Sequence, residues 1–103
     1  MTSPLPIKVT RRAAREIESA CEWWAVNRPA APGSLHQEIE RAFRLIAVQP
    51  GVGARALNAK LVGVRRIHLS RVRYHLYYRV RTEPAAVEIL ALWHTSRGSG
   101  PHV

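Results

Sequence analysis

The sequence predicts an α+β fold in which a helical hairpin packs on one face of a small, mainly antiparallel sheet. In the first half, two stretches carry apolar residues at the three- and four-residue spacing of amphipathic helices. In the second half, three stretches alternate between apolar and polar residues, as half-buried strands do. With a short strand before the helices, the predicted order is β-α-α-β-β-β. At 103 residues, the chain has the length of one domain, covering 1–103.

The N-terminal segment predicts one short strand and one helix. Residues 7–9 alternate in polarity after two prolines and form the strand. Thr10 can cap a helix that runs to about Asn27. The apolar stripe of this helix consists of Ala13, Ile17, Ala20, Cys21 and Trp24. Because Trp23 lies beside the stripe, we expect it to be partly exposed, either as an anchor for a partner or folded over the edge of the hairpin.

A second helix is predicted between about Ser34 and Val48, after a break rich in proline and glycine. Ser34 followed by Gln37 matches a capping box, and Pro50 sets the C-terminal limit. Two amphipathic helices with a short connection form a helical hairpin.

Three strands are predicted at about 64–69, 74–81 and 86–94, and their short connections indicate an antiparallel meander. The last strand has apolar residues on both faces, which indicates a central position. Residues 50–63 are predicted to be mostly loop, and the tail at about 98–103 to be a mobile end.

The middle strand has one apolar and one cationic face. The apolar side is formed by Tyr74, Leu76, Tyr78 and Val80, and we expect the helices to cover it. The opposite, open face is formed by Arg73, His75, Tyr77 and Arg79. Seven Lys or Arg and no carboxylate occur between Lys60 and Arg81, so this face is expected to meet an anionic partner.

The composition supports the same expectation without identifying the partner. The formal net charge is +9, all seven acidic residues are Glu, and the pI is near 11.3. Nucleic acid, an acidic protein segment and anionic lipid all fit such a charge, and a merely solvated basic surface fits it equally well.

The remaining features indicate a cytoplasmic setting. A single cysteine, Cys21, excludes an intramolecular disulfide. We expect no signal peptide and no membrane span, because the N-terminus lacks an apolar core and no apolar run approaches about 20 residues. The five histidines show no metal-ligand spacing, so neither a metal nor a cofactor is expected.

The second half also resembles a known family. The segments V-R-R-I-H-L, Y-H-L-Y-Y-R-V and I-L-A-L-W-H-T-S-R-G, together with the element order, resemble the RelE/ParE superfamily of toxins from bacterial type II toxin-antitoxin systems. The resemblance covers nearly the whole chain, and its specific part runs from Val64 to Arg97. The W-H-x-x-R ending at Trp93, His94 and Arg97 is similar to the ParE branch.

This resemblance implies a ParE-like toxin that inhibits DNA gyrase by binding it and breaks no covalent bond. It also implies neutralisation by a cognate ParD-like antitoxin, whose C-terminal segment wraps the toxin in a hetero-oligomer. The residues expected to bind partners are Trp23, Arg65, Arg73, His75, Tyr77, Arg79, His94 and Arg97. Tyr77 suits either stacking on a base or packing against an apolar side chain.

The alternative is a RelE-like endoribonuclease that cuts messenger RNA on the ribosome. That chemistry needs a proton shuttle and cations at one phosphate, for which Arg65, His75 and Arg97 are the candidates. His75 stands where the nucleases usually have an arginine, which disfavours the alternative. A homologue without toxicity that serves only as a binding partner is a third possibility.

Arg65 and Arg66 are adjacent on a strand, so only one of them can lie on the open face. An arginine on the covered face needs a partner, and Glu88 on the last strand is the candidate.

Overall fold

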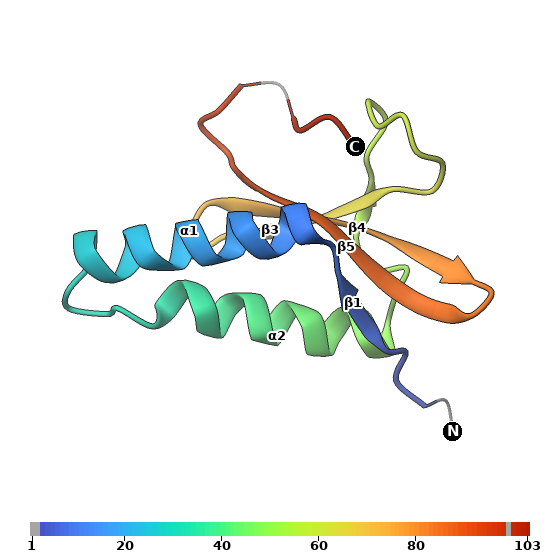
Figure 1. Cartoon of the computed structure of the whole chain (residues 1–103), viewed down its shortest axis with the longest axis horizontal. Helices are drawn as coiled ribbons and strands as arrows, with labels where there is room; N and C mark the ends of the chain where they lie inside the picture. Colours follow the sequence, from blue (N-terminus) through green and yellow to red (C-terminus); the bar gives the residue numbers. More distant parts are fainter. Residues whose placement is uncertain (1–2, 99) are drawn as a thin grey trace.

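A computed structural model describes residues 3–98 and 100–103 and confirms the predicted α+β fold, with one additional short strand. Two helices lie along one side of a five-stranded sheet (Figure 1). The elements are β1 (Ile7–Val9), α1 (Arg11–Asn27), α2 (Ser34–Val48), β2 (Ala54–Arg55), β3 (Arg65–Leu69), β4 (Tyr74–Thr82) and β5 (Ala85–His94). The unpredicted strand, β2, lies in the segment that the sequence predicts as loop.

The strand order is β1-β5-β4-β3-β2, so β5 lies between two strands as its two apolar faces predict. β1 runs parallel to β5, with Ile7 opposite Val87, whereas the other neighbouring strands are antiparallel. β1 covers β5 only as far as Ile89. Beyond that point, α1 reaches the exposed edge of β5, where Glu16 Oε1 accepts a hydrogen bond from the backbone N–H of Leu92 at 3.1 Å.

The two helices begin in different ways. Thr10 caps α1 as predicted, since its hydroxyl accepts a hydrogen bond from the Ala13 N–H at 3.2 Å. The capping box predicted at Ser34 and Gln37 does not form. Ser34 is already the first helical residue of α2, and Gly33 occupies the cap position without any side-chain hydrogen bond.

The main core lies between the helices and the sheet, and Tyr78 is its largest fully buried side chain. The Tyr78 hydroxyl accepts from the Gly53 N–H at 2.9 Å and donates to the Pro50 carbonyl at 2.8 Å, so it fastens the loop after α2. The fit is tight at Gly53, where an added Cβ would lie 2.7 Å from that hydroxyl. Burial raises the pKa of Tyr78, partly offset by the Gly53 hydrogen bond and the Arg65 charge.

The opposite face of the sheet is not open along its whole length. The β4–β5 register shifts between Tyr77 and Tyr78, so that Leu90 is an extra residue in β5. Leu90 and Ala91 both join Tyr77 in a second buried cluster with Val64. Tyr77 is only 4% exposed, so the prediction that it lies on an open face is wrong.

The C-terminal tail covers this second cluster. Pro101 is buried, and the Val103 carbonyl accepts hydrogen bonds from the N–H groups of Lys60 and Leu61. Arg12 on α1 donates to the carbonyl of His102 at 2.6 Å. In Figure 1, the chain after β5 turns back toward the loop between β2 and β3. The segment expected to be a mobile end thus packs on the sheet over residues 100–103, whereas residue 99 lies outside the described part.

Candidate functional site

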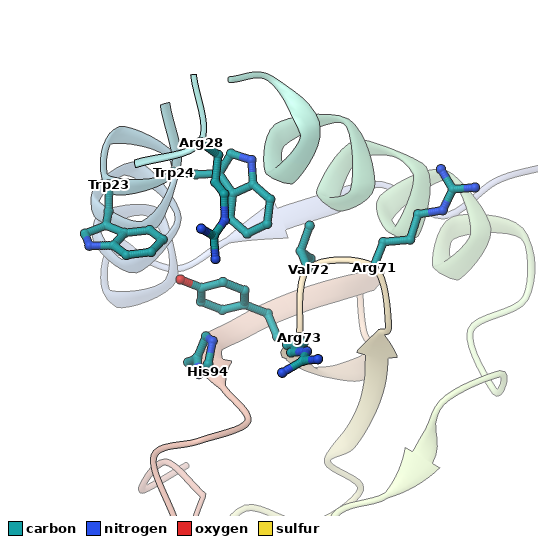
Figure 2. A pocket seen from close by; sticks show the side chains of 8 residues that line it. Trp23, Trp24, Arg28, Arg71, Val72, Arg73 and His94 are labelled. Carbon is teal, nitrogen blue, oxygen red and sulfur yellow. The ribbon is translucent and has the colours of Figure 1, made fainter. Parts of the chain in front are cut away.

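A cleft of about 650 Å³ lies between the C-terminal end of α1 and the turn that joins β3 to β4. Figure 2 shows the side chains that these elements and the end of β5 bring to the cleft, among which that of Arg71 extends away from the others. Its lining residues are Trp23, Trp24, Arg28, Arg71, Val72, Arg73, Tyr74 and His94.

The end of α1 provides the aromatic wall of the cleft. Trp24 belongs to the apolar stripe and packs against the main core, while its indole N–H donates to the Ala31 carbonyl at 3.0 Å. Trp23 is 51% exposed, as its position beside the stripe predicts. Arg28, just after the helix, places its guanidinium carbon 5.7 Å from the Trp23 ring and 5.5 Å from the Trp24 ring. These cation–π contacts fix a positive charge between two indoles.

The β3–β4 turn provides the facing wall. Val72 is buried beneath it and anchors the turn to the core. Arg73 has φ +60, and its carbonyl accepts a hydrogen bond from the Thr95 N–H at 3.0 Å. This left-handed backbone places Arg73 in the turn, so its predicted position on the strand beside His75 is wrong. Arg71 is mostly exposed and lies 4.0 Å from Glu38, a weak ion pair.

Tyr74 and His94 form the floor of the cleft. Their ring centroids are 4.9 Å apart and the rings are nearly perpendicular. The His94 Nδ1 accepts a hydrogen bond from the Ser96 N–H at 3.1 Å, which places the proton of the neutral ring on Nε2. Burial is the main cause that raises the pKa of Tyr74, and the charge of the nearby Cys21 raises it further. Tyr74 therefore remains a neutral hydrogen-bonding group at physiological pH.

The formally charged side chains that line the cleft are all positive. Its lining includes three arginines and no carboxylate. A ligand that combines negative charge with an apolar or aromatic body fits this chemistry. Of the predicted binding residues, Trp23, Arg73 and His94 gather here. Sequence reasoning missed Arg28 and Tyr74, because their proximity depends on how the hairpin packs on the sheet.

A second polar area lies on the sheet face opposite the helices. His68 and His75 are cross-strand partners with ring centroids 5.0 Å apart, and the exposed Arg66 lies two residue pairs farther along the same face. Burial lowers the pKa of His75, and the charges of Arg66 and His68 lower it further. Arg79 pairs with Glu88 at 2.6 Å on the same face.

The structure decides between the adjacent arginines of β3. Arg65 lies on the helix side, where it donates to the Gly53 carbonyl at 2.7 Å beside the Tyr78 hydroxyl. Arg66 is therefore the one on the open face. Glu88 is not the partner of Arg65, since it binds Arg79 and, at 3.6 Å, Arg81.

The three residues of the nuclease alternative do not gather at one point. Arg65 lies on the helix side of the sheet and His75 on the other. Arg97 stacks over Trp93, with its guanidinium carbon 3.8 Å from the ring centroid. The buried indole N–H of Trp93 has no hydrogen-bond partner among the described residues. The guanidinium of Arg97 therefore packs on the Trp93 ring.

Three further findings concern general features. Among residues 3–98 and 100–103, no cluster of three or more His, Cys, Asp or Glu could hold a metal ion. None of the helices in the described part of the chain is long and apolar enough to cross a membrane. Cys21 is partly buried, and desolvation raises the pKa of its thiol, as in an inert cysteine packed among apolar groups.

Comparison with known proteins places these features in a family. A chain of the chromosomal ParDE toxin-antitoxin system from P. aeruginosa is similar over 92% of this chain and all of its own, with a TM-score of 0.72 and 20% identity. A chain of the RelBE2 toxin-antitoxin complex from Mycobacterium tuberculosis is similar over 88% of this chain and 98% of its own, with a TM-score of 0.62 and 25% identity. No curated protein matches the sequence significantly. The model of the ParE toxin of the type II toxin-antitoxin system parDE matches residues 7–98, and the chain therefore belongs to this toxin family.

Proposed function

We propose that this toxin acts in the cytoplasm by binding DNA gyrase, and that a cognate ParD-like antitoxin keeps it inactive. The observation that carries the proposal is the cationic aromatic cleft, which has the chemistry of a docking site. Arg28 and Arg73, which have no carboxylate partner among the described residues, lie beside an exposed Trp23 and favour a protein segment that brings both acidic and apolar side chains. The proposed toxin needs no cofactor.

The antitoxin is the proposed occupant of the cleft. In this arrangement, carboxylates of its C-terminal segment pair with Arg28 and Arg73, whose planar guanidiniums suit bidentate binding. An apolar side chain packs on the half-exposed ring of Trp23. The segment continues past His94 toward Arg97, which borders the adjoining hollow beside α1. Arg65, by contrast, is engaged with Gly53 and is left out of the proposed binding set.

Gyrase is the proposed target because the family match is to ParE toxins. The separation of Arg65 from His75 argues against the ribonuclease alternative, which requires both side chains at one phosphate. The remaining basic surface, with Arg66 and His75, is then available for docking to the target.

The decisive experiment compares two purified systems. One measures gyrase supercoiling of plasmid DNA in the presence of the chain, and the other measures messenger RNA integrity during translation by ribosomes. We expect inhibited supercoiling, with cleaved DNA trapped on gyrase, and intact messenger RNA. Cut messenger RNA with normal supercoiling would overturn the gyrase proposal. No effect in either system would also overturn it and would indicate that the chain is a binding partner without toxicity.

The cleft is tested separately by substituting its residues. With the co-expressed antitoxin, Arg73→Glu should weaken binding by at least about ten-fold, because it reverses a charge in the cleft. The matched control is Arg44→Glu, which changes an exposed arginine on α2 that does not line the cleft. Equal affinities for both variants would exclude the cleft as the antitoxin site, independently of the gyrase result.

A further inference from the structure

One edge of β4 has no partner toward its C-terminal end. β5 pairs with β4 along all of Tyr74–Thr82, whereas β3 pairs with it only from Tyr74 to Tyr78. On the β3 side, no strand and no loop backbone of the described chain hydrogen bonds to residues Arg79–Thr82. In an antiparallel pair, every second residue directs its N–H and C=O away from the partner strand. This edge therefore presents free backbone donors and acceptors.

The chain before β3 turns away from this edge. Gly63 has φ +78, a left-handed conformation that ends the line of β3. The N–H groups of Lys60 and Leu61 bind the Val103 carbonyl instead of β4. The tail thus holds the loop to one side, and the edge at Arg79–Thr82 stays uncovered.

In the loop beside this edge, the small residues are packed inward and the large apolar residues are exposed. Its small residues, Ala56 and Ala59, pack against the second cluster of the sheet. Its large aliphatic residues point outward, with Leu57 at 89% and Val62 at 93% exposure. Folding alone favours the opposite arrangement, because burying leucine or valine stabilises a protein more than burying alanine does. Large apolar side chains held out beside an unpaired strand edge indicate a surface that meets another polypeptide.

A hollow of about 300 Å³ lies between the loop and the edge, lined by Val62 and by residues 79–83. Val80 is 39% exposed. On the other side of the strand, the guanidiniums of Arg79 and Arg81 share the single carboxylate of Glu88. The carboxylate of Glu83 also lines the hollow. The hollow therefore offers an apolar contact on one face, and on the other the N–H donors of two guanidiniums, which outnumber the carboxylate oxygens of Glu83 and Glu88.

We propose that this edge binds an extended segment of a partner protein, which adds a strand to the sheet alongside residues 79–82 of β4. Its backbone pairs with the free groups of the edge, an apolar side chain contacts Val62 and Val80, and a carboxylate meets Arg79 and Arg81. The site is separate from the aromatic cleft, and the proposal does not depend on gyrase as the target.

Two other occupants fit less well. Lipid tails satisfy no backbone hydrogen bond, so a membrane would leave the N–H and C=O groups of the edge unpaired. Pairing with a second copy of the chain would bring arginines of the two copies together. A symmetric antiparallel pairing centred on Val80 sets Arg79 opposite Arg81 of the other copy, and one centred on Arg81 sets that residue opposite itself.

The test uses the full chain and a short fluorescent peptide in which valine and glutamate alternate. We expect saturable binding by fluorescence anisotropy, and slowed exchange of the outward amides of Arg79–Thr82 by NMR. Methylating the peptide's backbone nitrogens should weaken binding by at least about ten-fold, because it removes donors and leaves the side chains in place. The double substitution Val62→Ser and Val80→Ser should also weaken binding, whereas Val26→Ser, at an exposed valine on α1, should not.

Several results would overturn the proposal. Absent or non-saturable binding would do so, as would equal binding of the methylated peptide. Binding to phosphatidylserine vesicles that is lost in Val62→Ser, with no slowing of amide exchange at 79–82, would assign the surface to a membrane. Amide protection at 79–82 that grows with protein concentration alone would assign it to a second copy. All substituted side chains are exposed, so unchanged far-UV circular dichroism will separate lost binding from lost folding.

Discussion

Removing the hydroxyl of Tyr78 should destabilise the toxin fold measurably. The Tyr78 side chain is fully buried, and its hydroxyl joins the Gly53 N–H at 2.9 Å to the Pro50 carbonyl at 2.8 Å. Tyr78→Phe keeps the ring but leaves both backbone groups without this partner. Each buried group left unsatisfied costs about 1–3 kcal/mol, so we expect a loss of about 2–4 kcal/mol in the free energy of unfolding. That is a large share of the roughly 5–15 kcal/mol typical of a domain.

The assay is urea unfolding at neutral pH, followed by tryptophan fluorescence. The midpoint should fall while the slope of free energy against urea stays constant, because the surface exposed on unfolding hardly changes. Tyr77→Phe is the matched control. Tyr77 is also buried, at 4% exposure, but its hydroxyl makes no hydrogen bond to the residues that the structure describes. Equal losses in the two variants would refute the assignment of stability to the Tyr78 hydrogen bonds.

The same substitution should change the alkaline limit of stability. The folded-state pKa of Tyr78 is raised above the ordinary value of 10.0, chiefly by burial. A raised pKa means that the folded state holds the proton more tightly than the unfolded state. Its contribution to stability is complete below pH 10.0 and is lost as the pH rises through the folded-state pKa. The unfolding free energy of Tyr78→Phe should therefore decline less steeply above that pH than that of the parent chain.

Three other perturbations follow from single contacts. Gly53→Ala should cost about 1–3 kcal/mol, since an added Cβ lies 2.8 Å from a backbone carbonyl, whereas Gly51→Ala, with nothing within 4 Å, should be nearly neutral in the same urea assay. Glu16→Ala should cost about 1–3 kcal/mol by leaving the Leu92 N–H unpaired, and Glu16→Gln should recover most of that loss in thermal unfolding, because its amide oxygen still accepts. The pKa of His75 is lowered below 6.5, so its contribution is complete above that pH and is lost as the pH falls through the folded-state pKa. The free energy of unfolding of His75→Asn should therefore fall less between neutral and acidic pH than that of the parent chain. An equal fall in the two proteins would contradict this.

Periodicity predicts the elements because each depends on local spacing. The stripe of Ile17 and Trp24 defines α1, and the alternation around Leu76 defines β4. The capping box at Ser34 failed because the preceding Gly33 takes the cap position, a choice between neighbours that spacing alone does not resolve. Strand β2 is two residues long, below the length at which alternation is visible.

The candidate site was harder to predict than the fold. Trp23 is exposed as predicted and lines the cleft together with His94, but no sequence pattern indicated that Arg28 would lie between two indoles. Arg73 was expected on a strand, and its left-handed backbone moved it into a turn facing α1. Tyr77 was expected on an open face, and the tail covers it.

The order of the elements, the apolar stripes of the helices and the excess positive charge follow from the sequence, because they depend on residue type and on spacing along one segment. Which cations meet which aromatic rings follows only from the folded arrangement. That arrangement also decides that the extra residue Leu90 builds a second cluster under the tail, and that Arg79–Thr82 have no strand beside them on the β3 side. The physical reason is that these features depend on contacts between residues far apart in the chain, whose register is set by packing of the whole core.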